Sequence, residues 1–197
     1  MLVDRLKSHK VYLASKSPRR HELLNGMGVD FEYLPLDVEE DYSEELTPVE
    51  VAEYLSQLKL SPIAYDFYEK GSIFIACDTI VVLNGRIIGK PVDLDDAKKI
   101  LRELSGNEHT VISGLSVAMN GKLSTAHKET LVKFKPLSDE EIDYYVDRYR
   151  PLDKAGAYGI QEWIGYIGIE YVEGSFYNIM GLPTRLLWEM LEAIVDG

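Results

Sequence analysis

Two Asn-Gly pairs, Asn84-Gly85 and Asn120-Gly121, constrain the fold of this chain more than any other feature of its sequence. Asn-Gly supplies the two left-handed residues of a tight hairpin turn, so each pair predicts an antiparallel connection between the segments that flank it. The expected strands are 73–83 with 86–89, and 109–119 with 122–135. A sheet that contains such hairpins is not purely parallel.

Helix signals separate these strands. Ser17 and Pro18 fit the N-cap and the first position of a helix. Capping boxes, in which Ser or Thr is followed three residues later by Glu, mark helix starts at Thr47 and Ser138. We expect helices at 18 to 26 or 28, 48–59, 63–68, 95–104, 139–150 and 183–194, and further strands at 11–14, 31–36 and 164–172.

This alternation predicts an α/β protein with a mixed β-sheet flanked by helices, elongated into two lobes around a central cleft. A length of 197 residues suits one domain, 1–197, because domains usually hold ~100–200 residues. The last helix has an apolar face that is either part of the core or the interface of a homodimer, and we expect core. Its residues are Leu186, Leu187, Trp188, Met190 and Leu191.

Composition excludes several classes of function. The net charge of −12 argues against binding a nucleic acid polymer, although a few local cations can still hold one small anion. Cys77 is the only cysteine, which rules out an intramolecular disulfide and suits a reducing compartment. Without a long apolar run or a signal-peptide core, we expect no membrane association and a cytoplasmic location. Motifs of zinc peptidases, serine hydrolases and dinucleotide-binding proteins are also absent.

The segment 15–20, Ser-Lys-Ser-Pro-Arg-Arg, follows a predicted strand and begins a helix. Arg19 and Arg20 fall in the first helical turn, where a cation is unfavourable by ~0.3–1 kcal/mol because the helix dipole is already positive there. An anion bound at this end would reverse that effect, using backbone N–H groups, hydroxyls and guanidinium groups. Alternatively, the arginines point into solvent or pair with acids such as Glu22 or Asp37.

Acidic residues occur in two places that suit a metal ion. Asp78 lies inside the apolar run 75–82, where a carboxylate is costly to bury unless it is paired or binds a metal. Acidic residues 39–41 follow a predicted strand. Carboxylates without soft ligands suit Mg²⁺ or Mn²⁺, and Mg²⁺ needs only one or two of them beside substrate phosphates. The alternatives are backbone capping by Asp78 and a solvated acidic loop at 39–41.

Two lysines and a glycine-rich loop complete the candidate residues. Lys90, in Gly-Lys-Pro, lacks the spacing of a Walker P-loop and is either a phosphate-neutralising charge or a solvated lysine. Lys59 has the simpler interpretation of a charge at a helix end. In segment 153–161, Gln161 offers a donor and an acceptor on one amide, which suits recognition of a base edge. A tight structural turn explains the glycines of that segment equally well.

Together these segments resemble the Maf family of nucleoside triphosphate pyrophosphatases. Any one motif would be weak, but the ordered set is specific and spans nearly the whole chain. The shared motifs are S-x-S-P-R-R at 15–20, Glu39-Glu40, D-T at 78–79, G-K-P at 89–91, L-S-G at 104–106, D-K-A-G-A-Y-G-I-Q at 153–161 and G-L-P at 181–183.

The resemblance implies metal-dependent cleavage of a nucleoside triphosphate to the monophosphate and pyrophosphate, in a cleft between two lobes, with Mg²⁺ or Mn²⁺ as the metal. The segment 157–161 resembles the branch that acts on dTTP and UTP. Glu162-Trp163 departs from the family, whose members commonly have Gly there, and a bulky Trp163 near the base would alter the range of accepted pyrimidines. The implied roles are substrate binding by Ser15, Ser17, Arg19, Arg20, Lys59 and Lys90, catalysis and metal binding by Glu40 and Asp78 with Asp78 as proton acceptor, and base choice by Arg19, Thr79 and Gln161.

Two other functions stay open. A nucleotidyltransferase also begins with a strand, a small-residue loop and an arginine, but it needs a second substrate. A nucleotide-binding regulator of cell division and septum formation would bind the same ligand with little turnover. The presence of both candidate catalytic acids, Glu40 and Asp78, favours an enzyme.

Overall fold

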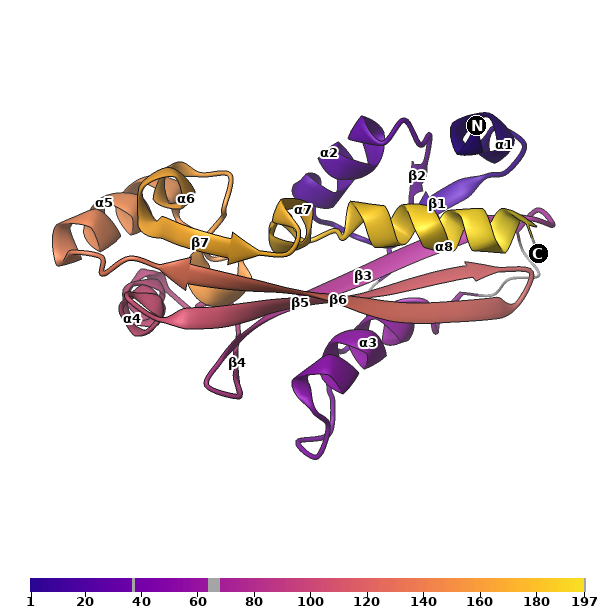
Figure 1. Ribbon diagram of the computed structural model, residues 1–197. Helices are drawn as coiled ribbons and strands as arrows, with labels where there is room; N and C mark the ends of the chain where they lie inside the picture. The colour runs from indigo at the N-terminus through magenta and orange to yellow at the C-terminus, as the bar shows by residue number, and fades with distance from the viewer. Residues whose placement is uncertain (37, 64–67, 197) are drawn as a thin grey trace. The chain divides into compact units, whose positions relative to one another are not determined.

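The computed structural model describes residues 1–36, 38–63 and 68–196. Over this part of the chain two compact units form: unit 1 comprises Met1–Asp78, Ser113–Lys128 and Gly181–Gly197, and unit 2 comprises Thr79–Ile112 and Glu129–Met180. The elements labelled in Figure 1 are α1 (Leu2–Leu6), β1 (Val11–Leu13), α2 (Pro18–Gly26), β2 (Glu32–Tyr33), α3 (Pro48–Leu58), β3 (Ile73–Leu83), β4 (Arg86–Ile88), α4 (Leu94–Leu104), β5 (Glu108–Met119), β6 (Lys122–Phe134), α5 (Asp139–Tyr149), α6 (Trp163–Gly168), β7 (Ile169–Glu173), α7 (Phe176–Met180) and α8 (Thr184–Asp196). A 3₁₀ turn, η2, spans Ala155–Ala157.

The described residues form one seven-stranded mixed sheet in the order β2-β1-β3-β5-β6-β7, with β4 paired to β3. β1 pairs in parallel with β2 and β3, whereas β3–β4 and β6–β7 are antiparallel. Both Asn-Gly pairs adopt positive φ angles at each residue, the conformation of the tight hairpin turn. The predicted α/β class and mixed sheet are therefore confirmed. The central cleft stays a prediction.

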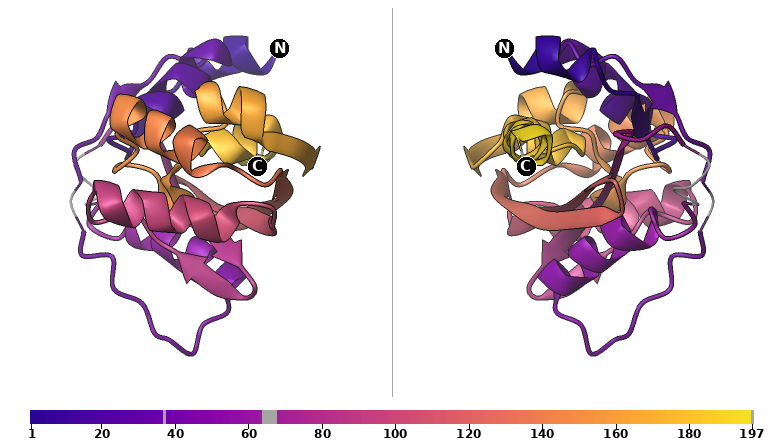
Figure 2. Two further views of the ribbon diagram at one scale, coloured as in Figure 1. Left: turned by 90° about the vertical axis from the view of Figure 1, so that its left-hand side faces the viewer. Right: turned by 90° about the vertical axis from the view of Figure 1, so that its right-hand side faces the viewer.

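In unit 1, α3 and α8 cover opposite faces of the β5–β6 hairpin, as Figure 2 shows with α8 seen nearly end-on. The capping box at Thr47 starts α3 as predicted, with Thr47 and Glu50 exchanging both hydrogen bonds. A Cβ at Gly114 of β5 would clash with the carbonyl oxygen of Ala52, so glycine lets α3 lie directly against the strand. On α8, Leu187 and Leu191 are fully buried, which confirms a core role for these two side chains.

In unit 2, α4 packs against α5 and η2. The predicted capping box at Ser138 is formed and starts α5. Lys98 of α4 pairs with Asp143 and Asp147 of α5, at 2.9 and 3.2 Å. Because both carboxylates are well exposed, such pairs add little stability. Both helices also bury apolar side chains. These include Leu101, Leu104, Ile142 and Val146.

The predicted strand 164–172 is partly wrong, because its first half is the helix α6 and only Ile169–Glu173 is a strand. Ile164 and Gly168 are the buried residues of α6, and their spacing of four is helical rather than alternating. The strand expected at 31–36 is reduced to the two residues of β2. Short helices α1 and α7 were not predicted, and most of the helix expected at 63–68 lies outside the described residues. None of the described helices is long and apolar enough to cross a membrane.

A buried histidine makes the stability of unit 2 depend on pH. His109 is 2% exposed, its Nε2 lies 2.7 Å from the hydroxyl of Tyr158, and its ring stacks on Phe134. Burial lowers the pKa of His109 from 6.5 to about 4. The folded state thus holds a neutral imidazole at pH values where the unfolded chain binds a proton.

We expect acid to destabilise the protein through His109. Its contribution is complete above pH 6.5 and is lost as pH falls towards 4, by about 1.4 kcal/mol per pH unit and about 3 kcal/mol in total. In His109→Gln the side chain stays uncharged and can still bond to Tyr158, so urea unfolding between pH 7.5 and 4.5 should show a shallower loss of stability. Equal pH slopes for the two proteins would contradict this assignment.

Candidate active site

The loop that follows β1 forms the start of the site in unit 1. Leu13 lies opposite Ile75 of β3, and Ala14 N donates to Ile75 O at 2.8 Å, which fixes where the chain leaves the sheet. Ser17 is the N-cap residue of α2 as predicted, yet within the described residues its side chain makes no capping hydrogen bond. Instead, Ser17 N donates to the Oγ of Ser15 at 3.2 Å. The first turn of α2 is thus not closed off by its own N-cap side chain, which suits an anion.

Arg20 lies across this loop and connects it to a distant segment. Its Nη1 donates to Ser15 Oγ at 3.2 Å and its Nε donates to the carbonyl oxygen of Gly181 at 2.8 Å. The same Gly181 oxygen accepts the thiol of Cys77, with a sulfur–oxygen distance of 3.4 Å. Because Cys77 directly precedes Asp78, Gly181 links the Ser15–Arg20 loop to the strand that carries the buried acid. Arg19 is half-buried in the same turn.

Three charged side chains of unit 1 meet at Lys59. Its ammonium group donates to Oδ1 of Asp78 and lies 3.1 Å from Oε1 of Glu40. The side chains of Lys59 and Asp78 are only 15% and 12% exposed, so their attraction is less screened than that of a surface pair. The C-cap position of α3 delivers Lys59 to this point. Lys59 is therefore not an ordinary exposed charge at a helix end, as its simpler interpretation held.

The remaining predicted residues belong to unit 2. Gly156 N donates to Gly89 O at 3.2 Å, which joins the Gly-Lys-Pro segment to the glycine-rich loop. Gly156 has φ +71°, and a Cβ there would approach Val81 to 3.0 Å, so the tight-turn interpretation holds at this glycine. Lys90 is exposed and Thr79 is half-buried.

Gln161 and its neighbours lie in the same loop. The Oε1 atom of Gln161 is buried and accepts no hydrogen bond from the described part of the chain. Trp163 begins α6, and its ring packs against Tyr144 at 4.7 Å between centroids. The expected effect of Trp163 on base choice stays a prediction. Asp37, considered as a partner for the arginines, lies outside the described residues.

Glu40 and Asp78 fit a divalent cation that also binds phosphate. Among the described residues no group of three His, Cys, Asp or Glu side chains is arranged to hold a metal ion. Both carboxylates nevertheless reach one ammonium nitrogen, so their oxygen atoms converge. Mg²⁺ and Mn²⁺ prefer such oxygen ligands, and one or two carboxylates suffice when substrate phosphates complete the shell.

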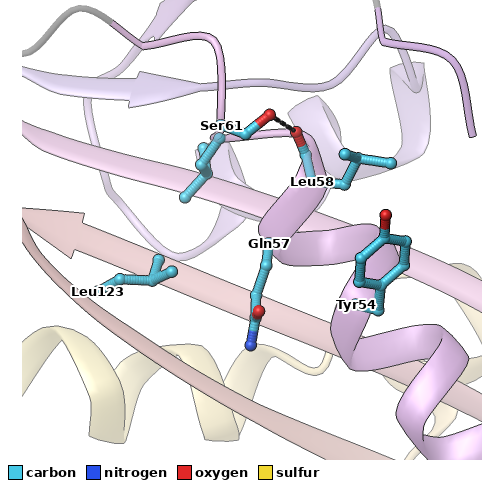
Figure 3. A pocket seen from close by; sticks show the side chains of 6 residues that line it. Tyr54, Gln57, Leu58, Ser61 and Leu123 are labelled. Atoms are coloured by element: carbon cyan, nitrogen blue, oxygen red, sulfur yellow. Dashed lines mark hydrogen bonds between the residues drawn. The ribbon is translucent and has the colours of Figure 1, made fainter.

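A separate hollow of about 330 Å³ lies beside α3 in unit 1 (Figure 3). None of the residues that line it is charged, and the Ser61 hydroxyl donates to the backbone oxygen of Leu58 at 2.8 Å. A triphosphate needs cationic or backbone donors, so this hollow does not suit it. The lining residues are Tyr54, Gln57, Leu58, Leu60, Ser61 and Leu123.

Comparison with known proteins decides the family. A sequence model described as "Maf-like protein" matches residues 10–194. The chain belongs to the Maf family. Among curated Maf relatives, the dTTP/UTP pyrophosphatase of Porphyromonas gingivalis is 47% identical over 97% of each chain. That of Bacteroides thetaiotaomicron is 45% identical over 98% of this chain and 100% of its own length. A solved structure, the Staphylococcus aureus Ham1 protein, gives a TM-score of 0.45 at 18% identity, covering 64% of this chain and 71% of that one.

Sequence reasoning missed two connections in this Maf protein. The Gly181 carbonyl receives Arg20 and Cys77, but a backbone oxygen has no side-chain signature, and only the G-L-P motif marked the place. Glu162 was singled out as a departure, yet its partners Lys154 and Tyr145 were not foreseen. The contacts of Gly181 join segments far apart in the sequence, and those of Glu162 join different structural elements. Local sequence patterns do not encode contacts of either kind.

The position of Lys59 predicts how this Maf protein binds a bare cation. In Lys59→Met the ammonium no longer competes for Glu40 and Asp78, so Mn²⁺ should bind about tenfold more tightly without nucleotide, as measured by electron paramagnetic resonance of free Mn²⁺. Lys98→Met is the matched control, because Lys98 also bridges two carboxylates but in unit 2. An equal gain in both variants, or none in Lys59→Met, would contradict the site.

Proposed function

We propose that this protein hydrolyses dTTP and UTP to the nucleoside monophosphate and pyrophosphate. The observation that carries the proposal is the convergence of Glu40 and Asp78 on Lys59. The same unit holds the Ser15–Arg20 loop, whose Arg20 donates to the carbonyl oxygen of Gly181. The names of the curated relatives support the choice of substrate. They are named dTTP/UTP pyrophosphatases, and they match this chain over nearly their full length.

The triphosphate is bound by the loop and the first turn of α2. Ser15, Ser17, Arg19 and Arg20 supply hydroxyl, guanidinium and backbone donors to the phosphate oxygens. The hydrogen bonds from Arg20 to Ser15 and Gly181 hold its side chain in place before the substrate arrives, which lowers the entropy lost on binding. Lys59 and Lys90 neutralise further phosphate charge.

Hydrolysis proceeds by in-line attack of water on the α-phosphorus. Asp78 accepts the proton of the attacking water, a new oxygen–phosphorus bond forms, and the bond from the α-phosphorus to the bridging oxygen breaks, so pyrophosphate leaves. Lys59 orients the Asp78 carboxylate and, with the arginines, stabilises the charge that develops on the leaving group. A divalent ion held by Glu40 and Asp78 supplies Lewis-acid polarisation of the phosphoryl oxygens when bound.

The two other functions receive less support. A nucleotidyltransferase needs an acceptor substrate, and the curated relatives are named pyrophosphatases. A regulator without turnover does not need two carboxylates converging on one ammonium group. The following assay distinguishes both alternatives from hydrolysis.

The decisive assay incubates the purified protein with a panel of nucleoside triphosphates and no acceptor. We expect dTTP and UTP to give monophosphate and pyrophosphate in the presence of Mg²⁺ or Mn²⁺, with the products resolved by chromatography. EDTA should stop the reaction, and purine triphosphates should react poorly. Release of orthophosphate with a diphosphate, reaction only after an acceptor is added, or binding of dTTP and UTP without turnover would overturn the proposal.

Asp78→Asn should lower turnover of dTTP by ~10²–10⁴-fold, because the amide cannot accept the proton of the attacking water. Circular dichroism should show an unchanged fold, since asparagine keeps the shape and the oxygen that Lys59 contacts. Asp139→Asn, which removes an exposed carboxylate paired with Arg102 in unit 2, is the control and should retain full activity. Undiminished pyrophosphate release by Asp78→Asn would remove Asp78 from this role.

A further inference from the structure

Glu162 is held in unit 2 by two partners that approach its two carboxylate oxygens. Lys154 Nζ lies 3.2 Å from Oε1, and the hydroxyl of Tyr145 donates to Oε2. The side chains of Lys154 and Glu162 are 9% and 19% exposed, so the pair is largely removed from water. Lys154 Nζ also lies 2.8 Å from Oδ1 of Asp153, so its ammonium group is held between two carboxylates. The position of Glu162 is therefore fixed by Lys154 and Tyr145 together.

Tyr145 fixes the loop as well as the carboxylate. Its hydroxyl accepts the backbone N–H of Gly159 at 3.0 Å while donating to Glu162. Burial, aided by the bond to Glu162, raises the pKa of Tyr145, so the phenol keeps the proton it donates. Glu162 N in turn donates to Gly159 O at 3.0 Å. Both ends of the turn 159–162 are therefore tied to one side chain of α5.

Gln161 lies inside this turn, against Glu162. A Cβ on Gly159 would lie 2.9 Å from Cδ of Glu162 and 3.2 Å from Nε2 of Gln161, so the two side chains pack over the same face of that glycine. The Oε1 atom of Gln161 is buried and receives no hydrogen bond from any described residue. Because buried acceptors are normally satisfied, this oxygen lacks a donor, and a ligand that reaches it could supply one.

A glutamine amide distinguishes uracil and thymine from cytosine only if the amide group cannot rotate by half a turn. Uracil and thymine present the N3–H donor between two carbonyl oxygens, whereas cytosine presents the N3 acceptor beside an amino group. A glutamine that rotates by half a turn exchanges its donor for its acceptor and pairs with either edge. A glutamine whose Oε1 is kept towards the ligand pairs with N3–H and leaves the cytosine edge unmatched.

We propose that Glu162, fixed by Lys154 and Tyr145, is a positioning residue that keeps Oε1 of Gln161 facing the N3–H of uracil or thymine and so selects against cytosine. The inference rests on the proposed pyrimidine triphosphate hydrolysis. It assigns to Glu162 a role in base choice that is exerted through its neighbour.

The test compares kcat/KM for UTP and CTP in the wild-type protein and in Glu162→Gln, which keeps the size of the side chain but removes its charge. We expect the UTP:CTP ratio to fall about tenfold, through a raised KM for UTP with kcat little changed. In a Gln161→Ala background, Glu162→Gln should change the ratio no further, because it acts through the missing amide. Glu141→Gln, which breaks the pair with Lys135 in the same unit, is the control and should keep the wild-type ratio.

Tyr145→Phe is the second variant and removes the hydroxyl that joins Gly159 to Glu162, so it should lower the ratio in the same way even if Glu162→Gln does not fold. A wild-type UTP:CTP ratio in folded Glu162→Gln or folded Tyr145→Phe overturns the inference. A further fall in the ratio when Glu162→Gln is added to Gln161→Ala overturns it as well. A wild-type protein that cleaves no pyrimidine triphosphate overturns the proposed function and the inference together. A wild-type protein that cleaves UTP and CTP equally overturns the inference alone.

Discussion

The ammonium group of Lys59, placed between Glu40 and Asp78, is the interaction on which the rest of the site depends. Asp78 follows Ile75, Ala76 and Cys77, which are fully buried, and a carboxylate there is costly without a partner. The partner is supplied by the end of α3, and α3 can lie against the sheet because Gly114 has no side chain. A packing feature of β5 thus allows α3 to bring Lys59 to Asp78.

The residues proposed for phosphate binding and for base choice are distributed over both units of the chain. Unit 1 holds the Ser15–Arg20 loop and the acids, whereas unit 2 holds Lys90 and Gln161. The division falls between Asp78, the last residue of a segment of unit 1, and Thr79, the first of unit 2. The proposed proton acceptor, Asp78, and a residue proposed for base choice, Thr79, are therefore consecutive in β3.

The features that could be predicted from the sequence are those specified by neighbouring residues. The capping boxes at Thr47 and Ser138 and both Asn-Gly turns are confirmed, because each is complete within four residues or fewer. The segment 164–172 was mistaken for a strand since its helical half is set by contact with a loop: a Cβ at Gly165 would clash with the Ile160 carbonyl. The hydrogen bond from Arg20 to Gly181 spans 161 positions, and no local pattern records it.

The network around Glu162 is better explained by positioning than by stability. A buried ion pair recovers little more than the desolvation of its charges, and well-packed apolar residues of similar volume are often at least as stabilising. The contrast with α4 and α5 is informative, because Lys98 and Arg102 form their pairs at the surface, where such pairs cost little. Lys154, Glu162 and Tyr145 instead place three polar groups inside unit 2, around the turn that carries the unsatisfied Gln161 oxygen. Rigid support of the Gln161 oxygen explains why these polar groups are buried here, whereas apolar side chains would pack equally well.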